Sequence, residues 1–213
     1  MNNHKITLYH YWRSSCSWRL RWAMDYKQVE YKLIAINLLK NEQNSPNYLR
    51  MNPTGNVPCL SIANRFFSDS IACLEWLENQ YPEKKLVPKY PDEALIVRGL
   101  TNCIASGVQP LQNLRVKRFF SDDKKEQNTY SKYWISRGFE AYEQLLSMYK
   151  CNGTFSFGDQ LTTADLALIP QVYNALRVDF NMEQFPNIFS IYKNAMETAS
   201  CKSSHPDSHP PTD

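Results

Sequence analysis

The segment Arg13-Ser14-Ser15-Cys16 gathers a cation, two hydroxyls and a thiol at one point of the chain. It follows an alternating apolar stretch, residues 6–11, and opens a run whose apolar groups have helical spacing. The first turn of a helix carries unpaired backbone N–H groups, so a thiolate or carboxylate held there gains hydrogen bonds and electrostatic stabilisation. The segment predicts an anion-binding site, and an ordinary Ser14-Ser15 helix cap is the alternative.

The elements that would position this segment form a strand–helix–strand unit, with the second strand over residues 29–37. Such a crossover makes the strands parallel and places the helix start at the carboxyl end of the first strand, where ligands bind. Ser45-Pro46 then opens a short helix, an Ala63-Asn64 turn joins two hairpin strands, and residues 68–70 cap another helix. The predicted order of strands and helices in this part of the chain is β-α-β-α-β-β-α.

Pro58 opens the first hairpin strand, although proline cannot donate to a ladder and marks an edge strand or a special turn. If the Val57-Pro58 bond were cis, the backbone of Val57 could pair with an extended, peptide-like ligand. Sequence alone favours the trans form.

After a proline-containing linker, residues 83–91, strand patterns end and helical spacing continues. We expect an α/β domain over residues 1–82 and an all-α domain over 92–200, with one helical stretch interrupted at Pro110 and a last helix over 186–199. Thr162 to Asp165 match a capping box, which gives Asp165 a role in folding. The polar residues 201–213 are expected to form a flexible tail.

Composition excludes several classes of protein. The net charge is +3, from 24 Lys and Arg against 21 Asp and Glu, without a dense basic run that would track a phosphate backbone, which argues against nucleic acid as a partner. The six cysteines form no C-x-x-C pair and no zinc-ligand spacing, so we expect reduced thiols, no metal and a cytoplasmic location. No stretch reaches about 18 apolar residues, so no membrane segment is expected.

The chain resembles the zeta class of the glutathione transferases over nearly its whole length, and the signature Ser14-Ser15-Cys16 carries most of that similarity. The fold implied is a thioredoxin-like domain followed by an all-α domain, the glutathione transferase architecture. The other matching segments are residues 36–39, Asn52-Pro53, Val57-Pro58, residues 104–114, Gly158-Asp159, residues 164–166 and residues 170–175.

By this resemblance the cofactor is glutathione, whose thiol must ionise to act as a nucleophile. Ser14 is the expected hydrogen-bond donor to the thiolate, with Ser15 and Cys16 beside it. Cys16 is equally consistent with a mixed-disulfide site or a small buried apolar group. Asp69 stands where the class has glutamine and could pair with the γ-glutamyl ammonium or simply cap a helix. The implied glutathione-binding residues are Gln43, Val57, Pro58, Asp69, Ser70, Gln109 and Asn113.

The class acts as maleylacetoacetate isomerase, so the implied substrate is a dianionic cis-enedione and Arg13 and Arg177 are its expected carboxylate partners. Thiolate addition, rotation about the resulting single bond and elimination would give fumarylacetoacetate with glutathione regenerated. The resemblance also implies a place in tyrosine and phenylalanine breakdown and a homodimer.

Three alternatives remain at this point. The same site could serve a general glutathione transferase that conjugates or dehalogenates small electrophiles such as α-haloacids. A non-catalytic binding protein of the same fold would have lost the serines or Val57-Pro58, and neither is lost. A thiol oxidoreductase would use Cys16, but no resolving cysteine stands at C-x-x-C spacing.

Overall fold

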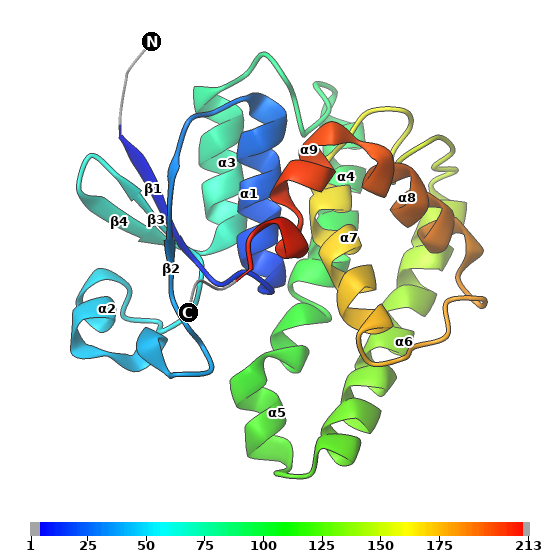
Figure 1. Ribbon diagram of the computed structural model, residues 1–213. Helices are drawn as coiled ribbons and strands as arrows, with labels where there is room; N and C mark the ends of the chain where they lie inside the picture. Colours follow the sequence, from blue (N-terminus) through cyan, green and yellow to red (C-terminus); the bar gives the residue numbers. More distant parts are fainter. Residues whose placement is uncertain (1–4, 211–213) are drawn as a thin grey trace. The chain divides into compact units, whose positions relative to one another are not determined.

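A computed structural model describes residues 5–210, which divide into two compact units (Figure 1). The first unit comprises the described residues up to Lys84 together with those from Ala199 onward, and the second comprises Lys85–Thr198. The first unit contains a mixed sheet and the second is helical, which confirms the predicted fold class. Among residues 5–210, no helix has both the length and the apolar character needed to cross a membrane.

The sheet of the first unit has the strand order β2-β1-β3-β4. Strand β1 runs parallel to β2 and antiparallel to β3, so that Leu8 lies opposite both Leu33 and Leu60. Leu8 and Leu60 are buried, which fixes the register of the central pair. The elements of this part of the chain are β1 (Ile6–His10), α1 (Ser15–Lys27), β2 (Lys32–Ala35), η1 (Glu42–Asn44), α2 (Pro46–Met51), β3 (Cys59–Ile62), β4 (Arg65–Ser68) and α3 (Ser70–Gln80).

Helices α1 and α3 lie against each other on one side of the sheet (Figure 1). A separate apolar cluster joins Tyr48 of α2 to Val57 and Cys59, with Tyr9 packed against it. Tyr9 and Cys59 are opposite each other in the β1–β3 register, so their side chains share the face of the sheet that Leu8 does not use. Both faces of this small sheet are therefore covered.

The hairpin that joins β3 and β4 is confirmed, and the surroundings of Pro58 differ from the expectation. Ala63 and Asn64 have φ angles of 48° and 63°, as a two-residue turn between twisted strands requires. Strand β3 is an interior strand and not an edge, because its paired residues begin at Cys59, one position after the proline. The Val57-Pro58 bond is cis, so the trans form that sequence alone favours is wrong.

The second unit is made of helices, and α4 packs chiefly on α7. The predicted interruption near Pro110 is confirmed, but it is wider than one residue. Helix α4 ends at Ala105, and Pro110 lies in a 3₁₀ turn, since it has no N–H to continue an α-helical ladder. The elements are α4 (Pro91–Ala105), η2 (Gln109–Gln112), α5 (Leu114–Phe120), α6 (Lys124–Met148), α7 (Thr163–Leu176) and α8 (Pro186–Glu197).

The expected flexible tail is wrong for residues 201–210, and 211–213 lie outside the described residues. The chain continues after α8 into α9 (Ala199–Ser204) and η3 (Pro206–Ser208), within the first unit. The buried indoles of α1 explain this order. Trp18 donates to the hydroxyl of Ser204 at 3.0 Å and Trp22 donates to that of Ser200 at 3.1 Å, so burying either indole needs this segment in place.

Candidate functional site

The start of α1 is built around Ser14, which is its N-cap. The hydroxyl oxygen of Ser14 accepts a hydrogen bond from the backbone N–H of Ser17 at 3.2 Å. That bond uses the oxygen as an acceptor and leaves the hydroxyl hydrogen able to donate. Helix α1 has 13 residues, so the N-terminal field adds to this donor. Ser14 is thus a helix cap and can also stabilise an anion.

The loop that precedes Ser14 is held by backbone and side-chain bonds. The N–H of Ser14 donates to the carbonyl of Tyr11 at 3.0 Å, which closes a tight turn. The N–H of Tyr11 donates to the hydroxyl of Ser17 at 3.3 Å. Ser17 is fully buried, so the loop is fastened to the core of the unit and Ser14 is placed by it.

Arg13 lies in this loop with a donor available for a ligand. Its guanidinium stacks over the ring of Trp12, 4.5 Å from the centroid, and one terminal nitrogen donates to the hydroxyl of Tyr11 at 3.3 Å. Its Nε is buried and makes no hydrogen bond to any residue in the described range 5–210. A buried N–H without an acceptor is costly, so an incoming carboxylate would gain a charge-assisted bond here.

Ser15 and Cys16 occupy the first turn of α1 beside the cap. Both are partly exposed, as is Ser14, and the thiol of Cys16 is free. The structure therefore brings the three residues predicted as catalytic to one half-exposed helix start. It gives Cys16 no more specific role than its position.

Gln43 and Val57 offer polar groups of a different kind in the same unit. Gln43 lies in η1, and its amide oxygen is buried without a hydrogen-bond partner among the described residues. Val57 is buried next to Pro58, and its main chain lies outside the β3 ladder that starts at Cys59. An amide oxygen that can accept a hydrogen bond and a main chain that is not paired in the sheet both suit a peptide-like ligand.

Asp69 caps α3, as one of the two interpretations predicts. A single carboxylate oxygen, Oδ1, accepts from the N–H groups of Ile71 and Ala72 at 2.8 and 3.0 Å. The second oxygen takes part in neither bond, so capping does not prevent Asp69 from meeting an ammonium group. The backbone of Asp69 has a φ of 71°, which sets the residue apart from the regular elements on either side.

Ser70 is buried and linked to a residue that sequence reasoning missed. The Nη1 of Arg19 donates to its hydroxyl oxygen at 2.5 Å. Arg19 is itself almost fully buried, on the face of α1 that meets α3. The signal in the sequence was a pair of arginines, Arg19 and Arg21, placed between the apolar residues of an otherwise buried helix.

Three of the predicted residues lie in the second unit. The side-chain amide of Gln109, in η2, donates to the carbonyl of Ala167 at 3.2 Å. Asn113 is the N-cap of α5, accepting from Arg115 N–H at 3.1 Å. Arg177 follows α7, is exposed and lies 5.9 Å from the ring of Tyr173. Gln109 and Asn113 thus have structural bonds of their own.

Lys117 of α5 adds a second cation near Arg177, and sequence reasoning missed it. Partial burial lowers the pKa of the Lys117 ammonium, and the positive charge of Arg177 lowers it further. Two cations that repel each other are both stabilised when an anion joins them. The signal was available in the run Arg115-Val116-Lys117-Arg118, directly after Asn113.

Comparison with known proteins agrees with these features. The family model "Glutathione S-transferase, N-terminal domain" matches residues 4–79, and the C-terminal domain model matches residues 112–203. A maleylacetoacetate isomerase of Dictyostelium discoideum is 42% identical over 193 residues, covering 88% of this chain and 87% of that protein.

Two solved structures are similar along almost the whole chain. A bacterial maleyl pyruvate isomerase, described as a zeta-class glutathione S-transferase, has a TM-score of 0.93 at 34% identity, covering 97% of this chain and all of that one (100%). A maleylacetoacetate isomerase from Anaeromyxobacter dehalogenans, with dicarboxyethyl glutathione and citrate bound in its active site, has a TM-score of 0.88 at 32% identity, with 99% and 94% covered.

Proposed function

The chain belongs to the glutathione S-transferase family, in its zeta class, and from this premise we propose that it isomerises maleylacetoacetate to fumarylacetoacetate with glutathione as cofactor. The observation that carries the proposal is the start of α1, where a capping serine keeps a hydroxyl hydrogen for a thiolate. The reaction would serve tyrosine and phenylalanine breakdown. The enzyme class is that of its curated relatives.

The residues of the first unit suit glutathione. Gln43 offers a buried amide oxygen without a partner, and the main chain of Val57, beside Pro58, is outside the ladder. Asp69 has a carboxylate oxygen that helix capping leaves unused, and Ser70 stands next to it. These groups match the amide, backbone and ammonium groups of a γ-glutamyl tripeptide.

When bound, glutathione supplies a thiol whose anion adds reversibly to the substrate double bond, so that rotation about that bond becomes possible. Ser14 donates its hydroxyl hydrogen to the sulfur and, with the positive end of α1, lowers the pKa of the thiol. Arg13, with its buried and unpaired Nε, binds a substrate carboxylate beside that sulfur. The same cation and helix start stabilise negative charge that develops on the substrate.

The test is an isomerisation assay on the purified full chain with maleylacetone and catalytic glutathione. We expect complete cis-to-trans conversion without net loss of thiol, because the cofactor is regenerated. Stoichiometric thiol loss, with chloroacetate as the better substrate, would instead identify a conjugating transferase. Absence of turnover with either compound, in protein that binds glutathione, would identify a binding protein.

Arg177 is proposed as the second carboxylate partner, next to Lys117. Arg177→Ala is expected to raise the KM for maleylacetone about tenfold, since a charge-assisted bond is lost, and to change the KM for glutathione less than about twofold. Initial rates at varied concentrations of each compound measure both values. Arg177→Lys should recover part of the loss, and Arg137→Ala, at an exposed surface pair, serves as the control. Equal effects on both KM values would remove Arg177 from substrate binding.

We also propose that the protein is a cytoplasmic homodimer. Phe66 and Phe67 on the edge strand β4 are 40% and 38% exposed, which favours association through this edge. All six cysteines are free, which suits a reducing compartment. Light scattering during size-exclusion chromatography measures the mass of the assembly. A monomer at micromolar concentration would contradict the proposed homodimer.

A further inference from the structure

We propose that Arg21 is a positioning residue for the reaction: together with residues 199–209, here named the strap, it fixes the loop of residues 11–14 that carries Ser14. The inference rests on the proposed role of Ser14 toward a thiolate. Within residues 5–210, Arg21 forms its hydrogen bonds with His10, Trp12 and Ser204, and none with Ser14 or Arg13. It acts on the loop through the main chain of Trp12.

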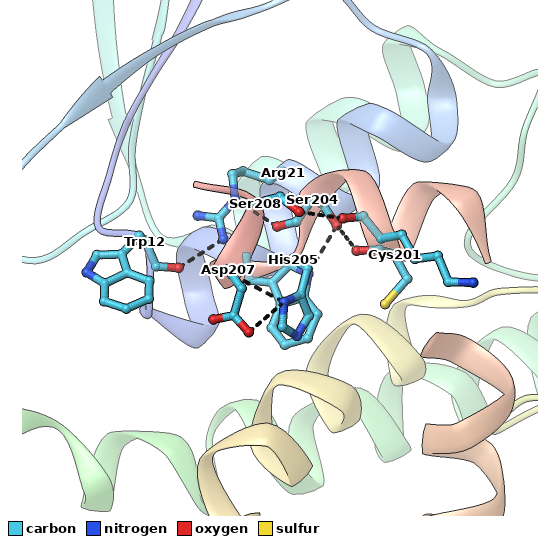
Figure 2. Close-up of polar contacts among 9 residues, drawn as sticks. Trp12, Arg21, Cys201, Ser204, His205, Asp207 and Ser208 are labelled. Carbon is cyan, nitrogen blue, oxygen red and sulfur yellow. Dashed lines mark hydrogen bonds and ion pairs between the residues drawn. The ribbon is translucent and has the colours of Figure 1, made fainter. Parts of the chain in front are cut away.

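The guanidinium of Arg21 joins three separate segments of the first unit. It is fully buried, and its Nη2 donates to the carbonyl of Trp12 at 3.0 Å (Figure 2). Its Nε donates to the carbonyl of Ser204 at 3.0 Å, and its Nη1 lies 3.0 Å from Nδ1 of His10. One planar group thus connects β1, the loop before Ser14 and the strap, in a geometry that only a guanidinium provides.

The charges around Arg21 are consistent with a fixed donor. Burial lowers the pKa of Arg21 to about 10, and Tyr31 and Asp25 oppose that shift, so the group stays positive at neutral pH. Because arginine only donates, Nδ1 of His10 must accept, and the ring is neutral. Burial, then Arg21, then His209 lower the pKa of His10 to about 3. His10 therefore stays an acceptor throughout the physiological range.

Side chains of the strap that pack on α1 hold the carbonyl of Ser204 in place. Ser204 is the last residue of α9, so its carbonyl has no partner within that helix, and Arg21 supplies one. Trp18 donates to the Ser204 hydroxyl at 3.0 Å, and the hydroxyl of Ser203 donates to Asp25 at 2.5 Å. His205 packs edge-on against Trp18, 4.9 Å between ring centroids.

These contacts transmit the position of the strap to the catalytic serine. The strap orients the guanidinium, the guanidinium fixes the Trp12 carbonyl, and Trp12 lies two residues before Ser14 in a turn closed by Tyr11. A hydrogen bond to a thiolate depends steeply on placement, so a loosened loop weakens it, while the glutathione-binding groups outside residues 11–14 keep their positions.

The experiment compares the wild-type protein with Arg21→Lys, which keeps the positive charge but has one ammonium in place of the separate Nε, Nη1 and Nη2 donors of the planar guanidinium. The ionisation of bound glutathione is followed by the ultraviolet absorbance of its thiolate as pH is raised, at saturating glutathione. We expect the thiol pKa to rise by about one unit in the variant and kcat to fall about tenfold. The KM for glutathione should change less than about twofold, because its proposed partners Gln43, Val57 and Asp69 lie outside this loop.

Lys27→Met is the matched control. Lys27 is another buried cation of α1, at the other end of the helix, with Nζ bonded to Glu78 and to the carbonyls of Tyr81 and Lys84 at 2.8, 2.8 and 2.6 Å. Loss of the Lys27 ammonium should lower the free energy of unfolding and leave the thiol pKa of bound glutathione unchanged. A structural effect and a positioning effect are thereby separated.

Trp18→Phe is the second variant. It keeps an aromatic ring, although a smaller one, at this position but removes the bond to Ser204, and we expect a smaller upward shift of the thiol pKa. An unchanged thiol pKa in Arg21→Lys overturns the inference, and so does an unchanged value in Trp18→Phe should the lysine variant not fold. A thiol pKa that is already unshifted in the wild-type protein contradicts the proposed function of Ser14 instead.

Discussion

Replacing Ser14 with alanine is expected to lower kcat for maleylacetone isomerisation about a hundredfold, because a donor aimed at the anionic sulfur is lost. The same change removes the acceptor for the N–H of Ser17, and a lost helix cap costs about 1 kcal/mol of stability. Steady-state kinetics at saturating glutathione and urea unfolding measure the two effects. The large kinetic effect and the small stability effect belong to one side chain.

Two variants separate these roles. Ser14→Thr keeps the hydroxyl and should retain most of the activity. Asp123→Ala removes another helix cap, the one that accepts from Lys125 and Glu126 at the start of α6, and should cost about the same stability without changing the rate. A rate within about twofold of wild type for Ser14→Ala would exclude Ser14 from the mechanism.

Replacing Asp165 with alanine is expected to lower the free energy of unfolding by about 3–5 kcal/mol, the largest stability effect we expect. Asp165 is fully buried, and its carboxylate accepts from the N–H of Ser156 at 2.7 Å and from the N–H and hydroxyl of Thr162 at 2.8 and 2.9 Å. Alanine would leave these donors buried without acceptors. Urea unfolding followed by circular dichroism measures the change.

The hydrogen bonds of the Asp165 carboxylate also predict the effect of a more conservative replacement. Asp165→Asn keeps one acceptor oxygen and should lose about half as much stability as alanine. Glu140→Ala, which removes an exposed surface pair with Arg137, should change stability by less than about 0.5 kcal/mol. If Asp165→Ala unfolded within about 1 kcal/mol of wild type, the capping box would not be a folding determinant.

The parts of the fold that depend only on residues close together in the sequence could be predicted from it. The Ala63-Asn64 hairpin, the capping box at Thr162 and Asp165 and the cap at Ser14 are all settled within a few positions. The strap was not predictable in this way. Its polar composition suggests a loose tail, and the indole that orders it, Trp18, lies 186 positions from its partner Ser204.

In the candidate site too, residues that are adjacent in the sequence were predicted, and residues that only the tertiary structure brings together were missed. Ser14, Ser15 and Cys16 are consecutive, so their grouping follows from the sequence. Arg19 beneath Ser70 was missed because it depends on the packing of α1 against α3. The effect of Arg177 on Lys117 was missed because the two residues are far apart in the sequence. The cis form of Val57-Pro58 was also missed, since local statistics favour trans and tertiary surroundings decide the outcome.

The return of α9 to the unit that contains β1 sets an order of assembly during synthesis. A ribosome releases residues 5–84 first, but Trp18 and Trp22 then lack the serine hydroxyls that the native state gives them. Those partners emerge only after all of Lys85–Thr198 has been made. The nascent thioredoxin-like unit therefore completes its own core after the helical unit has left the ribosome, although it is translated first.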